Sequence, residues 1–314
     1  MAKIPVFVVH GFLESGKTRF VQETLADDYF SGGERNLVIA CEEGVEEYED
    51  ELLQKTNTTL VVLEDKSEFN EMFLAECQKK YKPTQIIVEY NCMWGLDYLR
   101  EMYMPKGWFV AQVITTVDAT TFDVYLKNMK SLFMEMAKDS DLIIFNRSTD
   151  ETPAATYKRN MRAVNPKAQV VFEKEDGSQL EFEEEMPFDI NADVIEISDV
   201  DYGIWYIDAM DHPEKYDGKT MRFKAMAYTG GRLPKGYFVP GRMAMTCCAD
   251  DTAFIGFLCK SAYVDRIKSK QWLTVTAKAH IEKRAEYSGQ EGLVLQSTNI
   301  KSAEKPEEEL VYFS

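Results

Sequence analysis

The sequence predicts an α/β protein, built on a mostly parallel sheet, that is followed by a small β-rich domain. Short apolar runs alternate with amphipathic segments over the first 172 residues, a pattern typical of a parallel sheet covered by helices on both faces. A loop closed by glycines follows the first of these runs. Beyond residue 197 the segments are strand-like and separated by glycine turns, which favours a small OB-like barrel or a sandwich.

The glycine-closed loop matches the phosphate-binding pattern G-x-x-x-x-G-K-[ST] of P-loop NTPases. Gly11 and Gly16 let the backbone turn tightly and present N–H groups to a phosphate. Lys17 supplies a cation for the terminal phosphates, and Thr18 supplies a hydroxyl oxygen for a hard ion such as Mg²⁺. The alternative is a glycine-rich turn in an unrelated α/β domain. The nucleotide-binding residues expected in this loop are Gly11, Glu14, Ser15, Gly16, Lys17 and Thr18.

The order of elements predicts where the other polar residues gather. Further strands are expected at residues 36–41, 59–63, 85–89, 108–117, 141–145 and 168–172, and helices at 18–26, 67–80, 94–104, 120–138 and 152–164. Polar residues stand at the carboxyl ends of the strands, where ligands of such sheets bind. They are the loop itself, Cys41-Glu42, Glu89 and the run from Asn146 to Asp150. One pocket that collects them all is the simplest interpretation.

Composition changes divide the chain into three parts. Residues 1–175 form the expected nucleotide-binding domain, and the acidic, turn-rich residues 176–196 form a linker. Residues 197–314 form the β-rich domain, with one helix expected at 202–210.

The bulk composition is that of a globular protein, with 45% hydrophobic and 28% charged residues. The net charge of -17 opposes binding to nucleic acid and to anionic membranes, although solubility alone also explains it. No stretch approaches the roughly 20 apolar residues of a spanning helix. The six cysteines are scattered except for Cys247-Cys248, which fits a reducing compartment. We therefore expect a cytoplasmic protein with no nucleic-acid partner and no membrane insertion.

Two further features are typical of nucleotide sites. Glu89 ends a strand at the place where such proteins hold an acid near Mg²⁺ or its waters. Asn146, Arg147 and Asp150 lie in Asn-Arg-Ser-Thr-Asp, which is close to the Asn-Lys-x-Asp run that reads guanine, with Arg for Lys and one extra residue. Glu89 could instead be a surface residue at a strand end, and Asn146 a turn residue at the entry to a helix.

The first 172 residues resemble the CobW-type GTPases, a family linked to metal delivery. The matching residues are Gly11 to Thr18, Cys41-Glu42-Glu43-Gly44, Ile87-Val88-Glu89, Val117-Asp118-Ala119, the Asn146 segment and Asn165-Pro166-Lys167-Ala168. The resemblance implies hydrolysis of GTP with Mg²⁺, a client metalloprotein and, in many members, a homodimer. It implies that Lys17 stabilises charge on the transferred phosphate and that Thr18, Glu42 and Glu89 hold Mg²⁺, with Glu42 or Glu89 orienting water.

The chain departs from this family in its metal motif. The Gly-Cys-x-Cys-Cys run expected after the acidic residues 42–54 is absent. Another soft-metal site is conceivable, since Cys41 and Cys92 follow neighbouring strands with Glu42, Glu89 and His10 nearby, a donor set that suits Zn²⁺. The alternative is that both cysteines are buried as small apolar residues. Glu14 also differs, because it places a carboxylate where a small residue is usual, and we expect it to point away from the phosphates.

The C-terminal part resembles the soluble domain of the YcgQ-type bacterial membrane proteins. The resemblance lies in the run from Gly241 to Asp251, which contains Arg242 and Cys247-Cys248, and in Trp272 and Gly292. Cys247, Cys248 and Asp250 form a candidate soft-metal or redox site. Adjacent strand residues point to opposite faces, so the alternative is one buried cysteine and one at a bulge.

Two other classes of function remain open from the sequence. The chain could be a non-catalytic scaffold gated by a nucleotide, whose barrel binds a partner, or an ATP-dependent small-molecule kinase. A measurement of GTP turnover distinguishes the scaffold from a GTPase. Competition between ATP and GTP for binding distinguishes the kinase from a GTPase.

Overall fold

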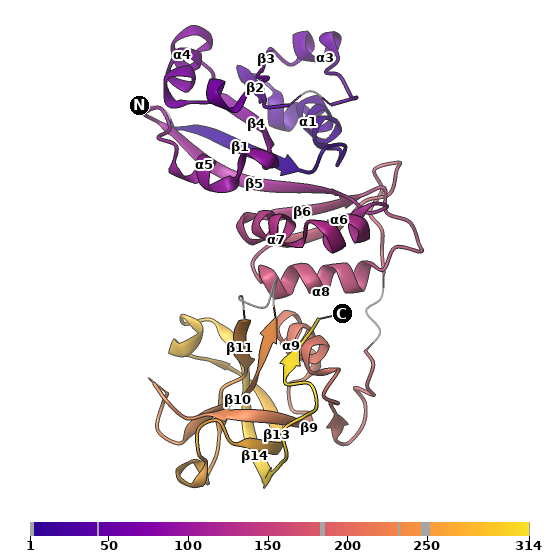
Figure 1. Ribbon diagram of the computed structural model, residues 1–314, viewed down its shortest axis with the longest axis vertical. Coiled ribbons are helices and arrows are strands. Elements are labelled where there is room, and N and C mark those ends of the chain that lie inside the picture. The colour runs from indigo at the N-terminus through magenta and orange to yellow at the C-terminus, as the bar shows by residue number, and fades with distance from the viewer. Residues whose placement is uncertain (1–2, 43, 183–185, 232, 246–251, 314) are drawn as a thin grey trace. The chain divides into compact units, whose positions relative to one another are not determined.

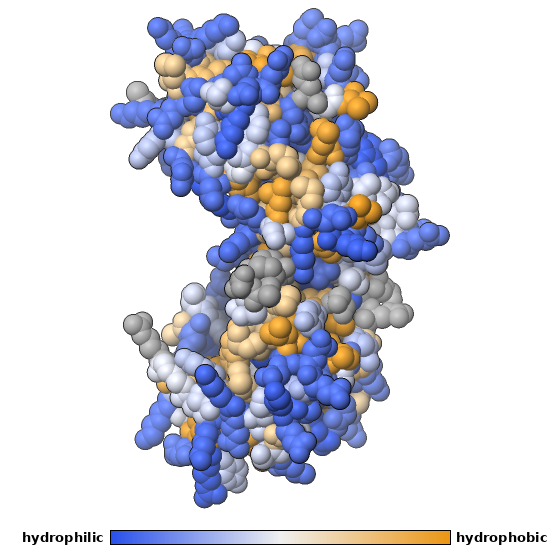
Figure 2. Space-filling model, viewed as in Figure 1, coloured by the Kyte–Doolittle hydropathy of each residue, from blue (hydrophilic) through white to orange (hydrophobic). Residues whose placement is uncertain are grey.

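The computed structural model describes residues 3–42, 44–182, 186–231, 233–245 and 252–313. The chain separates into two compact units, residues 1–154 with 164–182, and residues 155–163 with 183–314 (Figure 1). Among the described residues, no helix is long and apolar enough to cross a membrane. Polar and charged side chains cover much of the visible face of each unit (Figure 2).

The first unit is built on a parallel sheet. Its described strands follow the order β3-β2-β4-β1-β5-β6-β7, and every neighbouring pair is parallel. The strands are β1 (Ile4–Gly11), β2 (Asn36–Ala40), β3 (Thr58–Val62), β4 (Gln85–Asn91), β5 (Trp108–Asp118), β6 (Leu142–Asn146) and β7 (Gln169–Phe172). All five residues of β2 are buried, as expected for a strand covered on both faces. The predicted α/β fold with a mostly parallel sheet is therefore confirmed.

Apart from α1, the helices that the sequence predicted are shorter or divided in the structure. The described helices are α1 (Lys17–Ala26), α2 (Asp28–Ser31), α3 (Asp50–Lys55), α4 (Glu71–Tyr81), α5 (Leu96–Glu101), α6 (Phe122–Asn128), α7 (Lys130–Asp139) and α8 (Ala154–Val164), with short 3₁₀ turns η1 (Lys66–Glu68) and η2 (Cys92–Trp94). The start of α4 is set by Asn70, whose side chain accepts a hydrogen bond from the Phe73 N–H at 3.0 Å. The single helix expected at 120–138 is divided at Met129, which has φ of -132°.

The second unit is strand-rich, as predicted. Its elements are β8 (Ile195–Glu196), α9 (Tyr202–Asp211), η3 (Pro213–Lys215), β9 (Thr220–Tyr228), β10 (Tyr237–Met245), β11 (Thr252–Gly256), β12 (Cys259–Lys260), η4 (Val264–Arg266), β13 (Trp272–Lys283), η5 (Ala285–Tyr287), β14 (Glu291–Ser302) and β15 (Leu310–Val311). The described strands run β10-β12-β14-β13-β9, and β9 pairs back with β10, which closes a ring. A closed ring of five strands is compatible with an OB-like barrel. β8 lies inside the predicted linker, whose limits remain a prediction.

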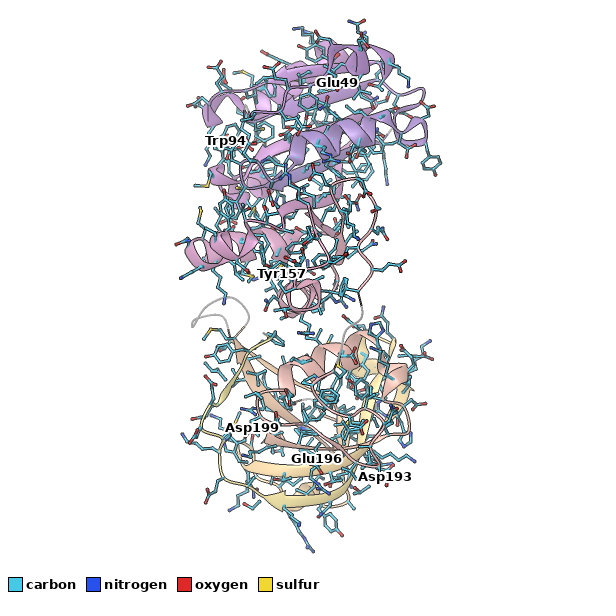
Figure 3. The ribbon with its side chains drawn as sticks, turned by 90° about the vertical axis from the view of Figure 1, so that its right-hand side faces the viewer. Glu49, Trp94, Tyr157, Asp193, Glu196 and Asp199 are labelled. Carbon is cyan, nitrogen blue, oxygen red and sulfur yellow. The ribbon has the colours of Figure 1, made fainter. Side chains whose placement is uncertain are left out.

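The core of this unit gathers around α9. Trp205 is fully buried, and its ring centroid lies 5.3 Å from that of Tyr202 and 4.8 Å from that of Phe223. The buried Arg242 of β10 forms an ion pair with Asp199 at 2.8 Å (Asp199 is labelled in Figure 3). Cys247, Cys248 and Asp250 lie outside the described residues, so the candidate site there remains a prediction.

Candidate phosphate-binding site

The loop between β1 and α1 has the geometry that close approach to a phosphate requires. Gly16 adopts φ of +88° directly before α1, a conformation that costs a residue with a Cβ about 1–2 kcal/mol. A Cβ on Gly11 would lie 2.4 Å from the Thr116 carbonyl oxygen. Ser15 donates its N–H to the Phe12 carbonyl at 3.1 Å, which closes the turn. The N-terminus of α1 thus faces the space enclosed by the loop, where an anion is favoured.

Lys17 is buried at the first position of α1, with only 3% of its side chain exposed. Its ammonium donates hydrogen bonds to the Phe12 carbonyl at 2.9 Å and the Gly11 carbonyl at 3.2 Å. It also forms an ion pair with Glu42, the second residue after β2. A buried ammonium is stable only with such partners, so the loop carries a fixed positive charge at its centre.

Thr18, Glu89 and Tyr48 form a chain of hydrogen bonds beside the loop. The Thr18 hydroxyl donates to Glu89 Oε1 at 2.8 Å, and the Tyr48 hydroxyl donates to Glu89 Oε2 at 2.5 Å. Burial raises the pKa of the Glu89 carboxyl, while these two donors act in the opposite direction. A threonine hydroxyl and carboxylate oxygens are hard donors of the kind that Mg²⁺ prefers, so this side-chain set fits the ion implied by the family.

Asn146 joins the end of β6 to the phosphate loop. Its Nδ2 donates to the Ser15 carbonyl at 2.7 Å. Its Oδ1 is buried and has no hydrogen-bond partner among the described residues. A buried acceptor without a partner is costly, and a donor on a bound ligand would satisfy it.

Arg147 and Asp150, from the same run, point to different partners. Arg147 forms an ion pair with Asp118 at 2.6 Å and donates to the Glu14 carbonyl at 3.0 Å. The Asp150 carboxylate is paired with Lys174 at 2.9 Å and is 85% exposed. Asn146 and Arg147 therefore contact the phosphate loop directly, whereas the exposed Asp150 carboxylate is paired with Lys174.

The soft-metal cluster that the sequence left open around Cys41 and Cys92 is not assembled among the described residues. Among the described residues, no group of three or more His, Cys, Asp and Glu side chains is arranged to hold a metal ion. His10 pairs with Tyr90 in the sheet, one position beyond the pair Val9 and Glu89. Because side chains alternate along a strand, His10 and Glu89 point to opposite faces and cannot share an ion. The structure therefore does not bring His10 together with these acids.

The two thiols instead have the properties of buried apolar groups. Burial raises the pKa of Cys92 to about 11 and raises that of Cys41 further. We expect iodoacetamide at pH 7.5 to leave both unmodified in the folded protein, because only the thiolate reacts and it forms only near or above these pKa values. Peptide mass spectrometry before and after urea unfolding measures this; rapid labelling of Cys92 in the folded state would contradict it.

Tyr48 was missed by sequence reasoning. It was visible only as one apolar member of the acidic stretch after β2, and its contact with Glu89 depends on how that stretch folds back. Lys174, which pairs with Asp150, was missed for a similar reason. A lysine at that position of the sequence does not indicate which residue it will contact. Asp118 lies in Val117-Asp118-Ala119, one of the runs that resemble the CobW-type GTPases, but its ion pair with Arg147 was not expected.

Together, the parallel sheet and the loop before α1 define a P-loop nucleotide-binding protein. Comparison with known families agrees. Residues 5–172 match the CobW/HypB/UreG nucleotide-binding domain, so the chain belongs to the CobW/HypB/UreG family of P-loop GTPases. Residues 172–313 match the DUF1980 C-terminal domain. The predicted CobW-type resemblance is confirmed.

Several solved structures are similar in part. The Zn(II)-bound YjiA GTPase from E. coli has 17% identity and a TM-score of 0.44, over 58% of this chain and 60% of YjiA. The hydrogenase maturation factor HypB from Archaeoglobus fulgidus has 16% identity and a TM-score of 0.41, over 56% of this chain and 84% of HypB. This chain thus spans about 60% of the YjiA chain that it matches. No curated protein matches the sequence.

Proposed function

We propose that this chain is a Mg²⁺-dependent GTP-binding protein that hydrolyses GTP. The observation that carries the proposal is the arrangement at the start of α1, where Gly16 turns the chain into the helix, the Lys17 ammonium is buried under the loop and the Thr18 hydroxyl donates to the Glu89 carboxylate. Membership of a family of P-loop GTPases supports it.

Each side chain has a defined role in this proposal. The loop amides and the N-terminus of α1 bind the phosphate oxygens, and Lys17 stabilises the charge that develops on the transferred group. Thr18 and Glu89 hold Mg²⁺, which when bound neutralises charge on the phosphates. Glu42 orients Mg²⁺ or the attacking water once a phosphate has taken its place on Lys17.

We further propose that Asn146, Arg147 and Asp150 face the base. If Asp150 accepts hydrogen bonds from guanine, Asp150→Ala should lower the preference for GTP over ATP at least about tenfold, since each such bond contributes about 1–2 kcal/mol. Competition between labelled GTP and ATP measures the preference. Asp176→Ala, at another exposed acid, is the control, and an unchanged preference in Asp150→Ala would show that Asp150 does not read the base.

The proposal extends to metal handling by the resemblance to CobW-type proteins. The nucleotide state would be coupled to delivery of an ion such as Zn²⁺ to a client metalloprotein, or to another partner, in a monomer or a homodimer. The sheet itself offers no such ion site among the described residues. A titration of Zn²⁺ in the presence of GDP and of a slowly hydrolysed GTP analogue tests the coupling, which predicts two different affinities.

The deciding experiment is equilibrium binding of labelled GTP with and without Mg²⁺, followed by single-turnover hydrolysis. The proposal predicts tight binding that depends on Mg²⁺, and turnover. Binding without turnover would favour the nucleotide-gated scaffold, and preference for ATP would favour the kinase.

A further inference from the structure

We infer that the acidic segment after β2, of which the structure describes Glu42 and residues 44–49, here called the strap, competes with the nucleotide for the phosphate loop. The strap connects β2 to α3 and ends at Glu49 (labelled in Figure 3). Its Glu42 carboxylate holds the Lys17 ammonium in the place of a phosphate. This inference rests on the proposed function and concerns its regulation.

The ion pair between Glu42 and Lys17 is the central contact. The two side chains are 13% and 3% exposed, so little water competes for either charge. A phosphate brought to Lys17 would face the Glu42 carboxylate at close range, where like charges repel strongly in a poorly hydrated site. Nucleotide binding therefore requires that Glu42 leave the ammonium.

The strap is fastened by three other residues, Glu14, Gln22 and Glu89. The Val45 N–H donates to Glu14 Oε1 at 3.2 Å. Gln22 of α1 donates to the Glu47 carbonyl at 3.3 Å and accepts from the Glu49 N–H at 2.8 Å. These contacts join the strap to the phosphate loop and to the helix that follows it.

Tyr48 is the third fastening point and a positioning residue for Glu89. Its hydroxyl uses the carboxylate oxygen of Glu89 that Thr18 leaves free. Lifting the strap would remove this donor and free Glu89 Oε2 for an ion. Opening of the strap and completion of the proposed Mg²⁺ site are thus one event.

The closed strap leaves little room over the loop. The pocket lined by Gly16, Lys17, Glu42, Val45 and Glu89, among others, encloses about 20 Å³, enough for about one water molecule. The strap therefore limits the space beside the Lys17 ammonium that a phosphate would occupy. When only a fraction of the molecules has the strap open, the apparent affinity for the nucleotide equals the intrinsic affinity multiplied by that fraction.

The test is the affinity for GDP in EDTA, where a metal role of Glu42 cannot contribute. Glu42→Gln should bind GDP about tenfold more tightly than wild type, because the competing charge is gone. Glu47→Gln is the matched control, since Glu47 carries the same charge in the same strap but is exposed and only its backbone carbonyl makes a strap contact. Equal or weaker binding by Glu42→Gln would overturn the inference.

Hydrogen exchange without nucleotide gives a second readout. The hydrogen-bonded Val45 and Glu49 amides should exchange about tenfold faster in Glu42→Gln and in Tyr48→Phe than in wild type or Glu47→Gln, because a fastening point is lost. Unchanged exchange in Glu42→Gln would count against the strap. Failure of the proposed function is distinguishable, because then wild type would bind no GDP while the exchange comparison would still report on the strap.

Discussion

Lys17→Ala is expected to weaken GTP binding by about 100-fold or more. Removing one partner of a buried charge pair costs about 2–5 kcal/mol, and each 1.4 kcal/mol is tenfold in affinity. The loss is large here because Lys17 is the cation buried under the loop, held by the Gly11 and Phe12 carbonyls. The substitution also leaves the Glu42 carboxylate without its ion pair and facing the phosphates. Equilibrium titration with labelled GTP in Mg²⁺ measures the change.

Arg19→Ala is the control for this variant. It removes the same charge from the same helix, but Arg19 is 36% exposed and pairs with Glu23 and Glu175 at the surface. Surface ion pairs contribute little, so we expect GTP affinity within about twofold of wild type. If Lys17→Ala bound GTP as well as Arg19→Ala, the loop would not be the phosphate site.

The phosphate loop could be predicted because its chemistry is local. Gly11, Gly16, Lys17 and Thr18 lie within eight residues, and the backbone geometry that they need follows from their own residue types. The parallel sheet could be predicted for a related reason, since strands buried on both faces read as continuous apolar runs. Neither prediction requires knowledge of contacts between residues that are far apart in the sequence.

The contacts of the acidic segment could not be predicted because they are not local. Glu42 was expected near Mg²⁺ by analogy, but its ion pair with Lys17 depends on the path of the chain after β2. The same path brings Tyr48 to Glu89, 41 residues further along the sequence. The alternative cluster with His10 depended on a detail of register, because a shift of one position along β1 moves a side chain to the other face of the sheet.

Gly16→Ala is expected to have two effects, backbone strain at residue 16 and the loss of the hydrogen bond between Asn146 and the phosphate loop. An alanine at φ of +88° is strained by about 1–2 kcal/mol. Its Cβ would also lie 2.4 Å from Asn146 Nδ2, which is held at 2.7 Å from the Ser15 carbonyl. Asn146 must move, so its hydrogen bond to the loop is lost at a further cost of about 1 kcal/mol. We expect reduced stability and GTP affinity at least about tenfold weaker.

Gly33→Ala isolates the strain. Gly33 has φ of +82°, but a Cβ there meets no atom within 4 Å. The variant should lose about 1–2 kcal/mol of stability from strain alone and keep wild-type GTP affinity. Urea unfolding and GTP titration of both variants make the comparison. Similar affinity in both would mean that Asn146 does not couple the loop to the end of β6, whereas a loss confined to Gly16→Ala would show that the phosphate loop and the predicted base-reading run act as one site.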